Sequence, residues 1–233
     1  MNFIVKNTTL PNLFDLIAPH YCRGCKAIGN PICDCCQNNI ILNFSNYCPN
    51  CKTPNPAGKC TKCKFLPPTF VIGNRNELIG QLVHDLKYRS TRALSKPLAS
   101  ILNETLPSID GKVDIVPLPT IHSHVRQRGL DHTYLIAKQL AKLRGPNYQV
   151  NPILTRAKNT VQVGADRAAR LSQANLAYSI NPNISINSNT TYLLFDDVWT
   201  TGASMKAAIK KLRAIGAKKI LVAVLAVSQI NQK

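Results

Sequence analysis

The sequence predicts an α/β protein in which a mostly parallel, buried sheet is flanked by helices and preceded by a small cysteine-rich region. The first observation is an apolar run at 192–195, followed by a helical pattern at 203–215 and a fully apolar run at 220–227. This order of strand, helix and strand is typical of a parallel sheet that is covered on both faces. The second observation is that all nine cysteines lie between Cys22 and Cys63.

Composition adds to this division. Pro67 and Pro68 mark a hinge, so we expect an N-terminal region over 1–66 and an α/β domain over 67–233. The 29 lysines and arginines exceed the 11 aspartates and glutamates, which gives a formal charge of +18. Such a charge favours nucleic acid, phosphorylated ligands or an anionic membrane surface as partners, although a soluble protein of a basic proteome has the same composition.

The location of the protein follows from what the sequence lacks. No apolar run approaches the roughly 20 residues that span a bilayer. The N-terminal residues lack the apolar centre and the cleavage site of a signal peptide. We therefore expect a cytoplasmic protein, in which closely spaced cysteines bind metal instead of forming disulfides.

Eight of the cysteines form four Cys-x2-Cys pairs, and each pair suits a knuckle that binds one tetrahedral Zn2+ with two thiolates. The pairs predict two structural zinc sites, with the ligands Cys22, Cys25, Cys33, Cys36, Cys48, Cys51, Cys60 and Cys63. We predict two sequential zinc ribbons, because a short segment then closes each site. Cross-braced pairing, in which the first pair joins the third, fits the spacing almost as well. Cys35 directly precedes Cys36 and is either an alternative ligand or a free thiol.

The remaining elements follow from hydrophobic periodicity. It predicts a short helix over 10–18, helices around 78–86 and 94–102, a first core strand at 113–119, a helix at 135–143 and a strand at 176–180. Cationic side chains gather after the 78–86 helix and in the polar segment 155–171, which has the composition of a loop that becomes ordered on binding. The candidate nucleic-acid contacts are Lys87, Arg89, Arg92, Arg156, Lys158, Arg167 and Arg170. For the first three, cations that complement a helix C-terminus are an equal alternative.

The stretch from Tyr192 to Ser204 carries the clearest functional signal. Two adjacent acids, Asp196 and Asp197, end an apolar strand, and a turn of small residues leads into a helix. At the carboxyl end of a parallel strand, the backbone N–H groups of such a turn can bind a phosphate. The carboxylates can accept hydrogen bonds from sugar hydroxyls or hold a cation such as Mg2+. Together these features indicate a phosphorylated ribose; solvated acids beside a helix N-cap are the plain structural alternative.

This stretch resembles the phosphoribosyl-pyrophosphate (PRPP) motif of type I phosphoribosyltransferases. The resemblance implies that Asp196 and Asp197 are catalytic residues that bind the ribose hydroxyls. It implies a 5′-phosphate site formed by Thr200, Thr201, Gly202, Ala203 and Ser204. It also implies that the pyrophosphate of PRPP, with Mg2+, binds in the loop after the 113–119 strand. The candidates there are Leu118, Pro119, Thr120, Arg126 and Arg128.

Nearly the whole chain resembles the ComF (ComFC) family. The resemblance rests on the four cysteine pairs and on the segments LVHDLKYRSTRALSKPLA, VPLP, RQRGLDHT, RAKNTVQVGADRAARLSQANLAY and LLFDDVWTTGASMKAAIKKLRAIGA. It implies a zinc-binding region joined to a phosphoribosyltransferase-like domain, and a part in natural competence and DNA uptake. Leu130-Asp131-His132 departs from the Phe-Asn-Gln of the family. Thr200 replaces the third acid that hypoxanthine-type phosphoribosyltransferases use on a purine, which argues against purine salvage.

Three functions fit these features. The first is a competence protein that binds phosphoribosyl groups and handles incoming single-stranded DNA in the cytoplasm, with other DNA-uptake proteins as possible partners. The second is an active phosphoribosyltransferase with an unidentified acceptor. The third is a regulatory module that senses PRPP, which ranks last because the sequence contains no helix-turn-helix pattern. We favour the first function.

Overall fold

The fold is a five-stranded parallel sheet with helices on both faces. The computed structural model describes residues 21–89, 92–121, 123, 125–126, 129–156, 178–182 and 184–228, so the helix expected over 10–18 lies outside the described residues. In spatial order the strands are β1 (Thr69–Asn74), β7 (Lys219–Val227), β6 (Thr191–Trp199), β2 (Val113–Pro117) and β3 (Tyr148–Val150). A separate antiparallel pair consists of β4 (Leu154–Arg156) and β5 (Tyr178–Ile180).

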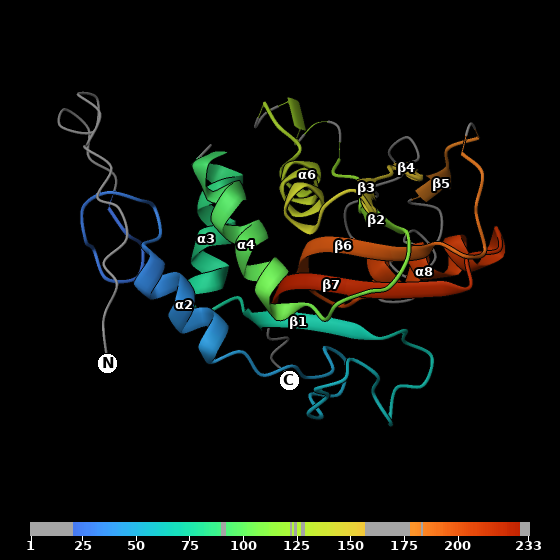
Figure 1. The fold of residues 1–233 in the computed structure, drawn as a ribbon, viewed down its shortest axis with the longest axis horizontal. Helices are drawn as coiled ribbons and strands as arrows, with labels where there is room; N and C mark the ends of the chain where they lie inside the picture. Colours follow the sequence, from blue (N-terminus) through green and yellow to red (C-terminus); the bar gives the residue numbers. More distant parts are fainter. Residues whose placement is uncertain are drawn as a thin grey trace, which may run out of the picture.

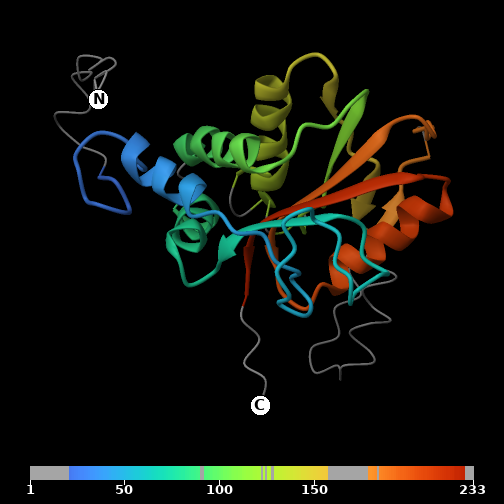
Figure 2. The ribbon, with the colours of Figure 1, turned by 60° about the horizontal axis from the view of Figure 1, so that its bottom comes forward.

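The helices divide between the two faces of the sheet. The described helices are α2 (Asp34–Leu42), α3 (Leu78–Tyr88), α4 (Ser95–Thr105), α6 (His132–Arg144) and α8 (Ala203–Ala214), with a 3-10 turn at Arg92–Leu94 before α4. Figures 1 and 2 show α3, α4 and α6 on one side of the sheet and α8 on the other. The predicted α/β class with a parallel sheet is confirmed.

The two faces of the sheet are apolar because successive side chains of a strand point to opposite sides. In β6, Leu193 and Phe195 lie in the core with α3, α4 and α6, whereas Tyr192 and Leu194 lie in the core with α8. All four side chains are at most 1% exposed. A strand buried on both faces explains why its sequence reads as a continuous apolar run.

The structure corrects three details of the predicted order. β1 was not predicted as a strand, so the strand at 113–117 is the second of the sheet and not the first. α2 was not predicted either, and it begins one residue after Cys33. The strand predicted at 176–180 is β5, which pairs antiparallel with β4 outside the main sheet.

The cysteine-rich region packs against both layers of the α/β core. Cys22 and Ile32 belong to the core on the side of α3, α4 and α6, and α2 lies beside α4. Cys48, Cys60 and Cys63 belong to the core on the side of α8. Among the described residues, no helix is long and apolar enough to cross a membrane.

Candidate functional site

The two predicted ligand loops begin side by side at the carboxyl edge of the sheet. Pro117, the last residue of β2, lies in register with Phe195 of β6. The N–H of Leu118 then donates to the carbonyl of Phe195 over 2.8 Å. The loop after β2 therefore starts one residue away from the acids of β6, which is the arrangement that one ligand needs to contact both loops.

Asp197 is a buried carboxylate with both oxygens engaged. It is 4% exposed, and its Oδ1 accepts from the ammonium of Lys87 on α3 over 2.7 Å. Its Oδ2 is in direct contact with Nε2 of His132, the first residue of α6. Burial by itself would raise the pKa of Asp197, but the hydrogen bond from His132 and the charge of Lys87 outweigh it, so the pKa is lowered.

Asp196 differs from its neighbour. It is half-buried, and its Oδ1 accepts from the backbone N–H of Asp197 over 2.8 Å. Burial, followed by the negative charge of Asp197, raises the pKa of Asp196 to about 8, although Lys87 and Arg156 act in the opposite direction. Two adjacent aspartates thus have opposite electrostatic environments.

The turn after β6 requires a glycine at one position. Gly202 has a φ of 74°, and a Cβ there would lie 2.3 Å from Cζ2 of the buried Trp199 ring. The turn leads directly into α8, whose first backbone bond runs from the N–H of Lys206 to the carbonyl of Gly202. The N–H of Ala203 donates to Oγ1 of Thr201 over 3.3 Å. The first-turn N–H groups of a helix lack intrahelical partners, so this end of α8 provides donors at the same edge as the acids.

A further cation approaches the acids from the β4–β5 pair. The guanidinium of Arg156 lies 5.7 Å from the ring centroid of Tyr178, which is 3% exposed. Burial raises the pKa of Tyr178, and the charge of Asp196 adds to this effect, whereas the Ser204 hydroxyl and Arg156 reduce it. These couplings place Arg156 and Ser204 in the surroundings of Asp196.

The loop after β2 is tied to the start of α6. Oγ1 of Thr120 lies 3.3 Å from Oδ1 of Asp131, and the same oxygen accepts from the N–H of Tyr134. Asp131 is therefore the N-cap of α6 and fixes where His132 enters the helix. Arg126 is exposed on this loop. Arg128, the other predicted pyrophosphate contact, lies outside the described residues, as do Lys158, Arg167 and Arg170.

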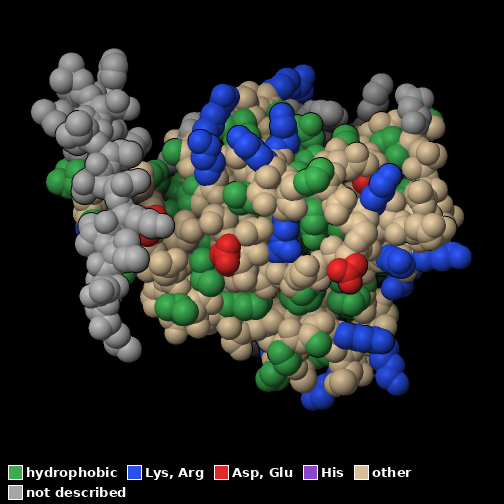
Figure 3. All heavy atoms as spheres, viewed as in Figure 1, with side chains coloured by type: hydrophobic (Ala, Val, Ile, Leu, Met, Phe, Trp, Pro, Cys, Tyr) green, Lys and Arg blue, Asp and Glu red, His purple; other side chains and the backbone are tan. Residues whose placement is uncertain are grey.

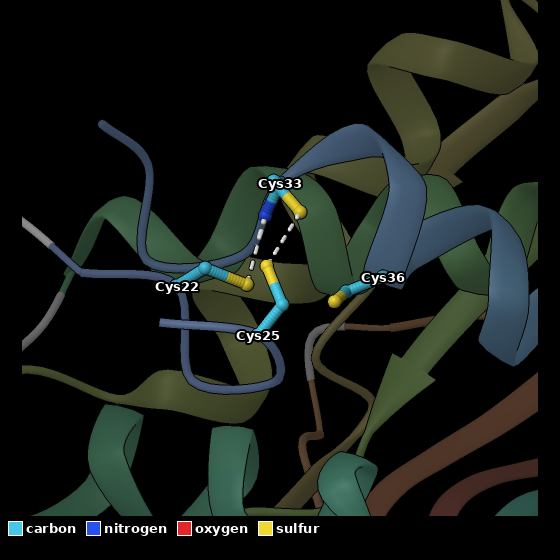
Figure 4. A group of neighbouring side chains, drawn as sticks. All are labelled: Cys22, Cys25, Cys33 and Cys36. Atoms are coloured by element: carbon cyan, nitrogen blue, oxygen red, sulfur yellow. Dashed lines mark hydrogen bonds between the residues drawn. The ribbon is translucent and has the colours of Figure 1, made fainter. Parts of the chain in front are cut away.

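The cysteines gather into two clusters in sequential order. One cluster contains Cys22, Cys25, Cys33 and Cys36, and the other contains Cys48, Cys51, Cys60 and Cys63; within each, the sulfurs lie within 4.8 Å of one another. Figure 4 shows the four sulfurs of the first cluster turned towards one another. The first cluster is no simple ribbon, because its second pair lies at the start of α2.

The first pair of each cluster has the same backbone geometry. The N–H of Lys26 donates to the carbonyl of Cys22, and the N–H of Lys52 donates to the carbonyl of Cys48, both over 2.9 Å. Lys26 and Lys52 have φ values of 66° and 60°, a conformation that side chains other than glycine rarely adopt. Two strained turns of identical form indicate that the same requirement, a pair of convergent thiolates, shapes both.

The sulfur spacing fits a metal ion. The Sγ atoms of Cys25 and Cys33 are 3.6 Å apart, and those of Cys51 and Cys60 are 3.5 Å apart. Four thiolates around Zn2+ at about 2.3 Å have sulfurs roughly 3.8 Å apart, whereas a disulfide needs about 2 Å. The hydroxyl of Thr53 and the backbone lower the pKa of Cys51 to about 6. Cys35 is exposed, while Cys36 is the member of the cluster.

Comparison with known proteins gives the chain its relatives. No protein-family model matches it. Competence protein F of Haemophilus influenzae is 29% identical over 228 residues, which cover 91% of this chain and 96% of the relative. Competence protein ComFC of Streptococcus pneumoniae is 24% identical over 195 residues, which cover 81% of this chain and 84% of the relative. The chain is therefore similar, over most of its length, to two competence proteins, one of which is named ComFC.

One solved structure was also compared with this chain. The match with a hypoxanthine phosphoribosyltransferase from Staphylococcus aureus covers 68% of this chain and 74% of the transferase, with 11% sequence identity and a TM-score of 0.38. At this level of superposition, two α/β proteins need have no more in common than a parallel sheet.

Three of the cations predicted to bind nucleic acid, among those that the structure describes, have contacts within the fold. Lys87 is paired with Asp197, and Arg89 lies 3.3 Å from Asp85. Arg92 donates to the carbonyl of Gly129 over 3.2 Å. The described members of the set thus lie at the acid pair or in contacts within the fold.

Sequence reasoning missed two groups near the site. His132 was part of a departure from the family pattern with no assigned role, and its partner Asp197 is 65 residues away in sequence. The second group is an ion pair between Arg23, inside the first Cys-x2-Cys turn, and the buried Asp85 of α3. Arg23 lies within a Cys-x2-Cys pair and Asp85 within the segment LVHDLKYRSTRALSKPLA, but neither pattern indicated that the two residues form a pair.

Proposed function

We propose that this chain binds a phosphoribosyl ligand such as PRPP at the carboxyl edge of its sheet and acts in natural transformation, where it handles incoming single-stranded DNA in the cytoplasm. Two relatives named as competence proteins support the biological role. The observation that carries the ligand proposal is the meeting of an acid pair, a glycine turn and the loop after β2 at one edge.

Each part of this edge has a role in the proposed complex. Asp196 and Asp197 are assigned to the ribose hydroxyls, and the turn 200–204 is assigned to the 5′-phosphate. The loop from Leu118 to Thr120 begins beside the acids and is assigned to the pyrophosphate, with Arg126 and Arg128 as charge partners. Mg2+ would accompany the pyrophosphate and neutralise part of its charge.

The cysteine clusters are assigned to two Zn2+ ions with a structural role. Closed sites of four thiolates leave no open position for a substrate, and they stabilise the segments that they join. Because the clusters pack into both layers of the core, metal binding would stabilise the whole domain.

A basic surface with an exposed aromatic ring favours contact with single-stranded DNA. Phe65 is 50% exposed, and Nζ of Lys206 lies 5.1 Å from its ring centroid. Lys210 and Arg213 are exposed on the same helix, α8. Cations that follow the backbone and a ring on which a base stacks are the features that bind single strands without reading their sequence.

Transfer chemistry is the alternative function that one observation favours. In a pentosyl transfer, positive charge develops on the ribose while pyrophosphate leaves, so carboxylates on one side and cations on the other lower the barrier. The site contains both kinds of charge, since the charges of Lys87 and Arg156 act on the Asp196 carboxylate. The acceptor of the ribosyl group is not indicated by any residue of the site.

Calorimetric titration with PRPP and Mg2+ tests the ligand proposal. We expect saturable binding that Asp196→Asn weakens by about tenfold or more, since a hydrogen bond to a charged group is lost. Asp110→Asn removes an exposed carboxylate elsewhere and is the matched control. Absence of binding by the wild-type chain, or equal affinity of both variants, would contradict the assignment. Release of pyrophosphate in the presence of a metabolite extract would show that the chain is also an enzyme.

A further inference from the structure

His132 is a buried imidazole that the proposed function does not yet use. It is 3% exposed and lies at the start of α6, where it contacts Oδ2 of Asp197 through Nε2. Its Nδ1 is buried and, among the residues that the structure describes, has no hydrogen-bond partner. Of the two ring nitrogens of His132, Nε2 therefore has a hydrogen-bond partner at the site, whereas Nδ1 has none among the described residues.

The unpartnered nitrogen decides which tautomer is present. A proton on Nδ1 would be a buried donor without an acceptor, which is more costly than a bare acceptor nitrogen. A proton on Nε2 instead points at the carboxylate of Asp197. The geometry therefore favours the form of His132 that donates from Nε2.

With this donor in place, the two acids of the pair are not equivalent. Lys87 holds Oδ1 of Asp197 and His132 holds Oδ2, so the Asp197 carboxylate has a fixed plane. Asp196 accepts one backbone hydrogen bond through Oδ1, and its Oδ2 has no partner in the described part of the chain. Asp196, the more exposed of the two acids, is therefore also the one with an oxygen available to accept a hydrogen bond from a ligand.

We propose that His132 is a positioning residue for the ribose-phosphate site: together with Lys87 it fixes the Asp197 carboxylate, so that Asp196 supplies the acceptor oxygen for the sugar hydroxyls. This inference rests on the proposed ribose-phosphate site. Without the His132 donor, Asp197 is held at one oxygen only and its carboxylate is free to rotate. Because the backbone N–H of Asp197 donates to Oδ1 of Asp196, the position of Asp196 is then less well fixed, and the affinity for the ligand falls.

Paired substitutions separate the donor from the volume of the side chain. His132→Leu keeps an apolar side chain of similar size and removes the donor, whereas His132→Gln retains a neutral N–H donor. We expect His132→Leu to weaken PRPP binding in Mg2+ by about tenfold and His132→Gln to remain within about threefold of the wild type. His84→Leu, which changes an exposed histidine of α3, is the control.

The results are interpreted with melting temperatures measured for every variant. Equal binding by His132→Leu and the wild type would overturn the inference. So would equal losses in His132→Leu and His132→Gln, because the donor would then not be the relevant property.

A second measurement does not depend on the ligand. Nitrogen chemical shifts of 15N-labelled histidine, recorded without PRPP, identify which ring nitrogen of His132 carries the proton. We expect protonation at Nε2, and a proton on Nδ1 with a bare Nε2 would overturn the inference. If the wild-type protein shows this Nε2 proton but binds no PRPP, the ligand assignment fails while the contact with Asp197 stands, so the two failures are distinguishable.

Discussion

At the scale of single residues, the acid pair shows how neighbours in sequence acquire different properties. The sequence assigns the same role to Asp196 and Asp197, because both are carboxylates at the end of one strand. Alternation along β6 turns them to opposite sides, where Asp197 meets Lys87 and His132. These partners come from α3 and α6, so their contacts follow from the tertiary fold and from no local pattern. The acid pair was predictable from the sequence, whereas its division into two environments was not.

The raised pKa of Asp196 has a consequence for stability. Its folded pKa of about 8 exceeds the ordinary value of 3.8, so the folded state binds a proton that the unfolded state has released. The contribution of this group is fully present below pH 4 and is lost as the pH rises to about 8. Asp196→Asn has no proton to lose. We expect its melting temperature to exceed that of the wild type by about 2–4 °C at pH 9 and to match it near pH 4.

Differential scanning calorimetry across this pH range measures the difference, with Asp110→Asn as the exposed control. A difference between Asp196→Asn and the wild type that stays constant from pH 4 to pH 9 would show that Asp196 titrates normally in the folded protein.

At the scale of elements, the spacing of residues in the sequence predicted the cysteine clusters, but it did not predict β1 and α2, whose formation depends on other parts of the fold. The Cys-x2-Cys pairs gave the two clusters because two residues between cysteines set the geometry of one turn. β1 was missed because its six residues follow two prolines and precede a helix, and a short apolar run gives no period of its own. Only its pairing with β7 makes it a strand. α2 was hidden by the cysteines at its start.

The two adjacent cysteines of α2 give a test of the cluster assignment. Cys36 belongs to the first cluster, whereas Cys35 is exposed and outside it. We expect Cys36→Ser to reduce the zinc bound per chain by about half and to destabilise the fold, because one of two closed sites loses a thiolate. Cys35→Ser should keep the full zinc content and the wild-type melting temperature.

Inductively coupled plasma mass spectrometry on purified protein gives the metal content of both variants. The opposite result, with zinc lost from Cys35→Ser and kept in Cys36→Ser, would mean that α2 presents the other cysteine to the metal.

At the scale of the whole molecule, charge is the dominant property. The formal charge is +18, and Figure 3 shows one face with many Lys and Arg side chains and few Asp and Glu. The sequence predicted a basic protein but not where its cations lie. The charges of Lys87 and Arg156 act on Asp196, whereas Lys210 and Arg213 are exposed on α8. Net charge is a sum over the sequence, whereas a binding surface requires the fold.

This distribution predicts a salt-dependent affinity for single-stranded DNA. Each phosphate contact to a single strand contributes roughly −0.7 to the slope of log affinity against log salt concentration. We expect the double substitution Lys210→Gln and Arg213→Gln to make this slope shallower by about 1.4. The double substitution Lys138→Gln and Lys142→Gln removes the same charge from exposed positions on α6, on the other side of the sheet. This variant should keep a steeper slope than the variant with both substitutions on α8.

Fluorescence anisotropy with a labelled oligonucleotide at several salt concentrations provides both slopes. Equal slopes for the two double variants would show that binding follows the total charge and not the surface of α8.

The order of the strands also determines when the protein can be completed. β7 lies between β1 and β6, and among the described strands it is the sole partner of β1. During synthesis, β1 leaves the ribosome about 150 residues before β7 does, as the positions of Thr69 and Lys219 show. Until then, β1 has no strand of the described sheet with which it can pair. The sheet is therefore completed only when β7 pairs with β1 and β6. A chain released before β7 is made has an unpaired edge on β6, which is prone to aggregation.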